Sequence, residues 1–285
     1  MKLKAFFTFA ILTVILLGCD SKLDSSGLPN KEKIMVNLLA FSDEVLSVHV
    51  SKSLPILDTS AEPIVTNAKV TITDDVGKSY NLAYDMASNR YVSTWLPQTG
   101  KTYAIKVALS NDLVTSDFYI PSANINTKAT WQDNTGQDSS GFPTGTINFI
   151  IKDNGQEHNY YEIALFRYQD VTQTFEILRV KPGNPEIAAN PIINKDGALI
   201  LDDGGFNGQN KSLNFITPYG SAGVVDYKYL VVVKSLSQQY YQYFKSLDNY
   251  QQQNGIFSEP SAVYTNVKGG VGICAGAGIY RDTIR

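Results

Sequence analysis

Histidines, serines and carboxylates are the side chains with which this sequence could do acid–base or nucleophilic chemistry. A Ser-His-Asp triad needs a histidine held next to a nucleophile. The chain has two histidines, His49 and His158, and neither has a nucleophile motif beside it; the segment 220–223 is one residue short of Gly-x-Ser-x-Gly. Both histidines are therefore predicted to be solvated. Paired carboxylates for glycoside hydrolysis meet in space rather than along the chain, so the sequence leaves open whether such a pair exists. No catalytic residue is predicted.

Two other motifs suggest a bound cofactor or metal ion. Gly270, Gly272 and Ala275 superficially match a dinucleotide-binding fingerprint, but only ten residues follow Ala275, too few for the helix and strand that complete such a site. A glycine-rich closing strand packed tightly against a neighbour is the simpler interpretation. Asp202 and Asp203 lack the alternating acidic ligands and later glutamate of a calcium loop, and they are predicted to form a hairpin turn. We expect no cofactor and no metal site.

Composition and charge exclude further classes of protein. With 285 residues, 43% of them hydrophobic and 18% charged, the chain is too apolar to be disordered. Two cysteines and two histidines are too few for a disulfide scaffold or an iron–sulfur site. The formal net charge is −3, and it becomes −5 when the two lysines of the first 18 residues are removed. Such a surface does not attract nucleic acid.

The first 19 residues predict a lipid anchor. Two lysines precede the run 5–17, whose 13 residues are interrupted by only two threonines. This run is shorter than the roughly 20 apolar residues that span a bilayer, but it suits a secretory signal. The Leu-Leu-Gly-Cys sequence at 16–19 resembles the lipobox of bacterial lipoproteins. We therefore predict a signal peptide over 1–18, acylation of Cys19 and a flexible tether over 19–32. Cys274, the remaining thiol, is predicted to be a small buried hydrophobe.

Alternating apolar and polar residues predict strands along most of the mature chain. Seven short strands between 33 and 122 favour a β-sandwich of immunoglobulin-like size, without the Cys–Trp–Cys core of a true immunoglobulin domain. The following segment is polar, so the domain boundary is placed near 121–126, and the fragment 33–121 is expected to unfold cooperatively. Residues 123–285 are predicted to form a second β-rich domain, with a surface loop over 182–197 and strands over 146–152, 160–168, 175–180, 198–201, 213–217 and 227–234.

One amphipathic helix is predicted over about 236–252, on the second domain. Ser235 and Gln238 fit a capping box at its start, and an Asn-Gly pair at 254–255 supplies a left-handed stop. The residues expected to face inward at helical spacing are Leu236, Tyr240, Phe244 and Leu247. The opposite side is polar but uncharged, and the candidate partner-contact residues there are Gln239, Gln242 and Tyr250.

Several segments resemble one protein family. They are 35–37, 48–53, 55–58, 67–74, 206–208, 240–247, 257–260 and 263–267. The most specific part of this resemblance is the order of four features near the C-terminus: the helix, Glu-Pro, Tyr-x-Asn and Gly-x-Gly. On these segments the chain resembles a Bacteroidota lipoprotein family known as domain of unknown function 4249, although Cys274 stands where the family more often has an aromatic residue. The resemblance implies a lipid-anchored outer-membrane protein of the cell envelope, often encoded beside a TonB-dependent transporter, with no known catalytic residue.

Two hypotheses of function stay open. The first is a noncatalytic accessory subunit of a TonB-dependent transporter or another outer-membrane β-barrel assembly, and it is supported by 17 tyrosines and 13 phenylalanines, since aromatics are enriched at interfaces. The second is a free-standing surface lipoprotein that binds glycan or peptide. A large apolar patch would favour the subunit, and a concave pocket rimmed by tyrosines the binder. The strand 160–168, apolar on both faces, is either central or an exposed aromatic platform.

Overall fold

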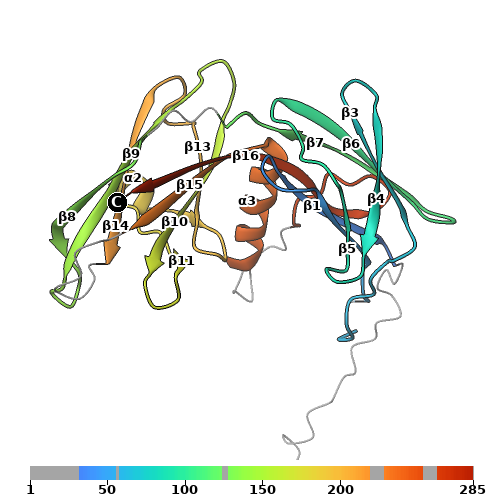
Figure 1. The fold of residues 1–285 in the computed structure, drawn as a ribbon, viewed down its shortest axis with the longest axis horizontal. Coiled ribbons are helices and arrows are strands. Elements are labelled where there is room, and N and C mark those ends of the chain that lie inside the picture. The colour runs from blue at the N-terminus through green and yellow to red at the C-terminus, as the bar shows by residue number, and fades with distance from the viewer. Residues whose placement is uncertain (1–31, 56–57, 124–127, 219–227, 253–261, 285) are drawn as a thin grey trace, which may run out of the picture.

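The computed structural model describes residues 32–55, 58–123, 128–218, 228–252 and 262–284. The predictions for the signal peptide, for Cys19, for nearly all of the tether and for the Asn-Gly stop fall outside these residues. The described part is mostly strand (Figure 1). Its first strands are β1 (Ile34–Phe41), β2 (Ser47–Lys52), β3 (Lys69–Asp74), β4 (Ser79–Asp85), β5 (Arg90–Val92), β6 (Lys101–Ala108) and β7 (Leu113–Ile120).

The second half of the chain holds the remaining strands and both described helices. The strands are β8 (Thr130–Gln137), β9 (Pro143–Lys152), β10 (Tyr160–Gln169), β11 (Thr174–Leu178), β12 (Ile192–Ile193), β13 (Leu199–Asp202), β14 (Asn210–Pro218), β15 (Tyr229–Leu236) and β16 (Val271–Ile284). The helices are α2 (Pro185–Ala188) and α3 (Gln238–Gln252). The prediction of an N-terminal sandwich followed by a β-rich part with one amphipathic helix is confirmed. Figure 1 shows α3 between two lobes.

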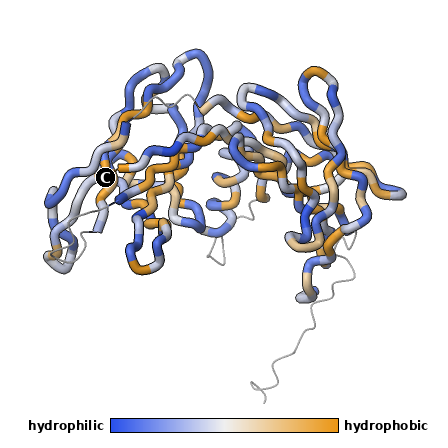
Figure 2. The backbone as a smooth tube through the Cα atoms, viewed as in Figure 1, coloured by the Kyte–Doolittle hydropathy of each residue, from blue (hydrophilic) through white to orange (hydrophobic). Residues whose placement is uncertain are grey.

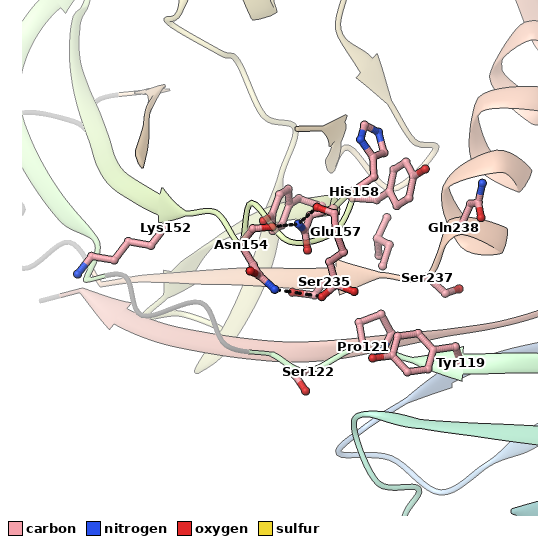
Figure 3. A pocket seen from close by; sticks show the side chains of 14 residues that line it. Tyr119, Pro121, Ser122, Lys152, Asn154, Glu157, His158, Ser235, Ser237 and Gln238 are labelled. Atoms are coloured by element: carbon pink, nitrogen blue, oxygen red, sulfur yellow. Dashed lines mark hydrogen bonds between the residues drawn. The ribbon is translucent and has the colours of Figure 1, made fainter. Parts of the chain in front are cut away.

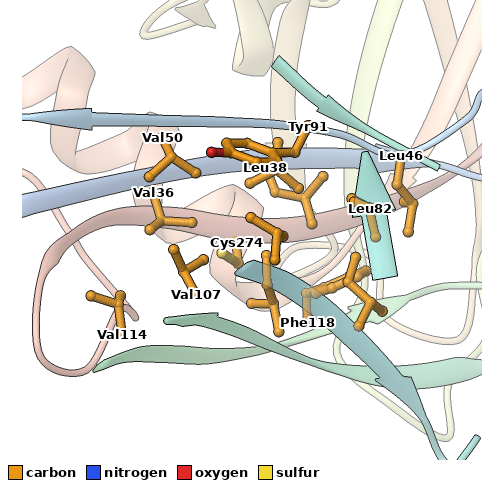
Figure 4. Packing of buried hydrophobic residues seen from close by; sticks show 14 of the residues in the cluster. Val36, Leu38, Leu46, Val50, Leu82, Tyr91, Val107, Val114, Phe118 and Cys274 are labelled. Carbon is orange, nitrogen blue, oxygen red and sulfur yellow. The ribbon is translucent and has the colours of Figure 1, made fainter. Parts of the chain in front are cut away.

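The N-terminal lobe consists of β1–β7 and the first half of β16. Its strands run in the order β16-β1-β2-β5-β4-β3-β6-β7 within a 13-stranded sheet that continues into the other lobe. The alternation along β6 buries Tyr103, Ile105 and Val107 while the residues between them face outward. Figure 4 shows the resulting core, in which Cys274 lies among aliphatic side chains. The thiol is the small buried hydrophobe that the sequence predicts, and burial raises its pKa to about 12.

The C-terminal lobe consists of β8–β15, α3 and the second half of β16. A three-stranded sheet, β14-β9-β8, packs against β10, β15 and β16, and the core between them includes Phe149, Phe215 and Ile163. Strand β10 pairs with β13 and with β15, and residues on both of its faces, including Ile163 and Ala164, are buried, so it is a central strand rather than an exposed platform. Figure 2 shows hydrophobic residues along the strands of both lobes.

Strand β16 belongs to both lobes. Its first half pairs parallel with β1 up to Phe41 and Ala277, and its second half pairs antiparallel with β15 from Ala277 onward. Where it passes the end of β7, a Cβ on Gly276 would lie 2.3 Å from the carbonyl oxygen of Tyr119. The Gly-x-Gly pattern therefore marks a tightly packed closing strand, as predicted. The division into 33–122 and 123–285 stays a prediction, and β16 crosses it.

Two segments contain more regular structure than the sequence predicts. Strand β8 lies within the polar segment after the boundary; among the strands that the structure describes it pairs only with β9, and nearly all of its side chains are exposed. An edge strand with few buried side chains has no apolar alternation to detect. The predicted surface loop 182–197 holds α2 and β12, which are too short to give a periodic signal.

Candidate functional site

Helix α3 begins two residues later than predicted. Strand β15 extends to Leu236, which pairs with Tyr160 of β10 and Ala277 of β16, so Leu236 is buried in a strand rather than in the helix. The capping residue is Ser237, whose Oγ accepts a hydrogen bond from the backbone N–H of Tyr240 at 3.3 Å. The prediction that Ser235 caps the helix is wrong, because Ser235 is still within the sheet.

Two tyrosines fix the inner side of α3 on the sheet. The hydroxyl of Tyr240 donates to Glu162 Oε2 at 3.1 Å, and that of Tyr241 donates to Asp202 Oδ2 at 2.6 Å. The ring of Tyr241 also stacks on Tyr160 with 4.5 Å between centroids. Burial, followed by the charge of Glu162, raises the pKa of Tyr240 well above its usual value. Both hydroxyls therefore stay protonated donors, and the helix is held rigidly on β10 and β13.

The three candidate partner-contact residues lie on one side of α3. At 100° per residue, positions 239, 242 and 250 fall within about 80° of each other. Gln239 and Gln242 are half-buried, whereas Tyr250 is 56% exposed. The structure therefore brings the three together, with the accessible surface concentrated on Tyr250. Cys19, the predicted lipid anchor, lies outside the described residues.

An apolar groove of about 340 Å³ runs beside this side of the helix. We call it the α3 groove. Its apolar lining consists of Leu39, Ile192, Ile193, Tyr243, Phe244 and Leu247, and its polar lining of Asn194, Lys195, Asp248 and Gln251. The sequence predicts Leu247 as an inward-facing core residue and gives no signal that singles out Ile192 and Ile193. They belong to β12, some 50 residues before the helix, so no local pattern connects them with it.

A second cavity of about 520 Å³ lies between the two lobes (Figure 3). We call it the interlobe pocket. The N-terminal lobe contributes Tyr119, Pro121 and Ser122. The C-terminal lobe contributes residues 235–238, where β15 meets α3, together with Lys152, Asn154 and 157–161. The pocket is thus built at the place where β16 crosses from one lobe to the other.

Each histidine has a carboxylate partner that the sequence did not show. His49 is not solvated as predicted, since its side chain is only 18% exposed and its Nε2 lies 3.4 Å from Glu62 Oε2. The same carboxylate accepts the hydroxyl of Ser51. In a Ser-His-Asp triad the imidazole lies between serine and carboxylate. Here the carboxylate lies between serine and imidazole, so the order needed for nucleophilic catalysis is not formed.

His158 borders the interlobe pocket and binds a buried aspartate. Its Nδ1 lies 2.7 Å from Oδ1 of Asp203, which is fully buried, while the His158 side chain is 49% exposed. Asp203 Oδ2 accepts the backbone N–H of Asn159 at 2.7 Å, and the Asp203 N–H donates to Asn159 O at 3.1 Å. The pair therefore braces the loop that leads into β10. It is invisible to sequence reasoning because 45 residues separate its members.

The remaining motifs behave as structural features. Asp203 begins a turn in which its carbonyl oxygen accepts the N–H of Phe206 at 2.8 Å, but the predicted hairpin is wrong, because β13 and β14, on either side of this turn, belong to different sheets. Within the described ranges, no group of three or more His, Cys, Asp or Glu residues could hold a metal ion. The same part of the chain has no helix of the length and apolarity that crossing a membrane requires.

Two proteins of known structure to which this chain is similar are remote in sequence. The major pilin SpaD from Corynebacterium diphtheriae is 12% identical with a TM-score of 0.20; the match covers 72% of this chain and 62% of the pilin chain. A chain from the structure of Gaeumannomyces graminis manganese lipoxygenase with part of Komagataella pastoris zonadhesin is 11% identical with a TM-score of 0.18, covering 72% of this chain and 89% of that chain. Both TM-scores are too low to support an argument. No curated protein matches the chain.

One family model matches almost the whole sequence. It covers residues 20–282, from the residue after Cys19 nearly to the end of β16. Both lobes, α3 and all residues lining the α3 groove and the interlobe pocket lie within this range. The chain therefore belongs to the family described as Domain of unknown function (DUF4249).

Proposed function

We propose that this protein is a noncatalytic lipoprotein, anchored in the outer membrane through Cys19, that serves as an accessory subunit of a TonB-dependent transporter or another outer-membrane β-barrel assembly. The observation that carries the proposal is the α3 groove, an apolar depression beside a polar but uncharged helix side. Burying uncharged groups costs much less than burying charges. The lining of the groove is mainly apolar, although Lys195 and Asp248 also contribute to it, and the uncharged side with Gln239, Gln242 and Tyr250 lies on the same helix. An apolar groove next to such a helix side is therefore suited to bind a protein surface.

Charge introduced on this helix side is expected to break the association. The variants are Gln239→Lys, Gln242→Lys and Tyr250→Lys. Each places an ammonium group where the partner would exclude water, so association should weaken by about 2 to 4 kcal/mol if the residue lies at the interface core. The free energy of unfolding of the isolated protein should change by less than about 0.5 kcal/mol for the exposed Tyr250. The measurement is the yield of a copurifying β-barrel protein after gentle detergent extraction.

Gln137→Lys is the matched control, since Gln137 is exposed on β8, in the other sheet of the C-terminal lobe. It should leave copurification unchanged. Recovery of the wild-type protein without any stoichiometric outer-membrane partner would refute the accessory-subunit proposal.

Cys19→Ala is expected to release the protein from the membrane. Acyl chains on this cysteine would contribute about 0.8 kcal/mol for each buried methylene group, and two or more chains anchor a protein stably. Without them, the protein expressed in the absence of partners should move to the soluble fraction and should not incorporate labelled fatty acid. A variant that still fractionates with outer membranes under these conditions would show that something other than Cys19 is the anchor.

The interlobe pocket favours a second candidate, the free-standing surface lipoprotein that binds glycan or peptide. The pocket is concave, and Tyr119, Tyr160 and Tyr161 contribute to its walls. Aromatic walls with a few polar groups are typical of ligand sites. The same copurification experiment separates the candidates, because a free-standing binder needs no stoichiometric partner.

A further inference from the structure

The interlobe pocket contains polar groups that the fold itself does not use. Several lining groups are already bound: Tyr161 donates to Asp153 Oδ1 at 2.5 Å, and Ser237 Oγ accepts the N–H groups of Tyr240 and Gly276, each at 3.3 Å. In the described part of the chain, other lining groups have no hydrogen-bond partner. They are the side chains of Ser122, Lys152, Ser235 and Gln238 and the hydroxyls of Tyr119 and Tyr160.

The walls that carry these free groups are held in place. Tyr160 stacks on Tyr241 and meets the ring of His158 edge-on, with 4.9 Å between centroids. His158 is in turn held by the buried Asp203. The loop is closed by Asn159, whose side-chain amide donates to the carbonyl oxygens of residues 154 and 157 at 2.9 and 2.8 Å. A ligand would therefore meet largely preformed walls, which lowers the entropy cost of binding.

The charges around the pocket do not favour an ionic ligand. The lining includes one lysine, Lys152, and one glutamate, Glu157, whose formal charges cancel in sum, and Glu157 accepts a hydrogen bond from the side-chain amide of Asn154 at 3.3 Å. His158 is already paired with Asp203. The free groups are mainly hydroxyls and one amide, which both donate and accept hydrogen bonds. Their natural complement is a neutral ligand with many hydroxyl groups.

The strands that lead into the pocket do not suit a peptide. Extended peptides commonly bind by adding a strand to an open sheet edge. Strand β10 lies between β13 and β15, and β15 lies between β10 and β16, so the main-chain groups of both strands are already paired. Recognition must then come from side chains, with tyrosine rings against apolar ligand faces and hydroxyls against hydroxyls.

We propose that the interlobe pocket binds a short neutral oligosaccharide, with Ser122 and Tyr119 from one lobe and Tyr160, Ser235 and Gln238 from the other. A pocket of about 520 Å³ is within the range of small-molecule sites, roughly 300 to 1,000 Å³. The proposal goes beyond the accessory-subunit function and is independent of it, since the α3 groove shares none of these residues.

The test is calorimetric titration of the full chain in detergent with neutral oligosaccharides of glucose, galactose, mannose, xylose and N-acetylglucosamine. The comparison ligands are an oligogalacturonate and a tetra-alanine peptide. At least one neutral oligosaccharide should bind saturably. Gln238→Ala should weaken that binding by about five- to tenfold, as expected for the loss of one hydrogen bond. Ser122→Trp should abolish it, because Ser122 is an exposed residue of the wall and the indole would fill the pocket.

Ser140→Trp is the control, since Ser140 is exposed in the β8–β9 turn; it should bind like the wild type. Thermal unfolding checks that each variant is folded. If Ser122→Trp is unfolded, the double variant Tyr119→Phe with Gln238→Ala is used in its place. The double variant should weaken oligosaccharide binding more than either single change. Three results would overturn the proposal: no heat with any neutral oligosaccharide, binding that the pocket variants leave unchanged, or binding of only the acidic oligosaccharide or the peptide. Copurification of a barrel partner is measured separately and bears only on the accessory-subunit proposal.

Discussion

A fragment that ends at residue 122 is expected to lose cooperative unfolding. It retains β1–β7 but lacks β16, which pairs with β1 along seven residues, from Met35 with Val271 to Phe41 with Ala277. It also lacks Val267 and Cys274, both of which are buried in the core of the N-terminal lobe. The fragment 33–122 would therefore expose an edge of β1 and part of its core to water. The measurement is urea unfolding followed by circular dichroism.

The main-chain contacts around β7 show how closely the C-terminal segment completes this lobe. Thr115 and Lys268 exchange two backbone hydrogen bonds, of 3.0 and 2.8 Å, and Ser116 Oγ donates to Asn266 O at 2.9 Å. Joining residues 262–278 to the fragment through a flexible linker should restore a sigmoidal transition. Cooperative unfolding of 33–122 alone would instead support the independent domain that the sequence pattern predicts.

Lys234→Met is expected to lower the free energy of unfolding by about 3 kcal/mol or more. Lys234 and Glu162 face each other on β15 and β10 and form an ion pair beneath α3. The Glu162 side chain is 4% exposed and that of Lys234 is 20% exposed. Removing the ammonium leaves a buried carboxylate without its counter-charge, which typically costs 3 to 5 kcal/mol. Lys234 Nζ also lies 4.8 Å from the centre of the Phe41 ring, so contact with β1 is lost as well.

The double variant Glu162→Gln with Lys234→Met tests whether the unpaired carboxylate causes the loss of stability. It removes both charges while keeping an acceptor for the hydroxyl of Tyr240, so most of the lost stability should return. Glu186→Gln is the surface control, because Glu186 pairs with Lys211 at 2.7 Å but is 56% exposed. It should change the free energy of unfolding far less than Lys234→Met does, because solvent screens an exposed ion pair. Equal losses in Lys234→Met and Glu186→Gln would show that burial does not strengthen the inner pair.

The local elements follow from short-range patterns. The alternation of apolar and polar residues between 33 and 122 predicts short strands there, of which β6 is one, and the apolar spacing around Tyr240 and Phe244 predicts α3 to within two residues at its start. These predictions succeed because the side chains on the buried face of a strand or helix recur only a few positions apart in the sequence. The start of α3 was misplaced because a serine is found at both 235 and 237, and only the pairing of β15 with β10 decides which of them ends the strand. The family, too, could be recognised from sequence segments alone.

The sites depend on contacts between distant residues. The α3 groove joins Ile192 and Ile193 to Leu247, the interlobe pocket joins Tyr119 to Tyr160 and Gln238, and the carboxylate partner of His158 is 45 residues away. No periodicity connects such positions, because they meet only when the sheets pair and pack. Strand β16 is the clearest case. The sequence by itself determined that the segment containing Gly270, Gly272 and Ala275 forms a tightly packed glycine-rich strand. Only the tertiary structure decided that it continues to Ile284 and is shared by both lobes, because the edges of β1 and β15 that it pairs with are created by folding.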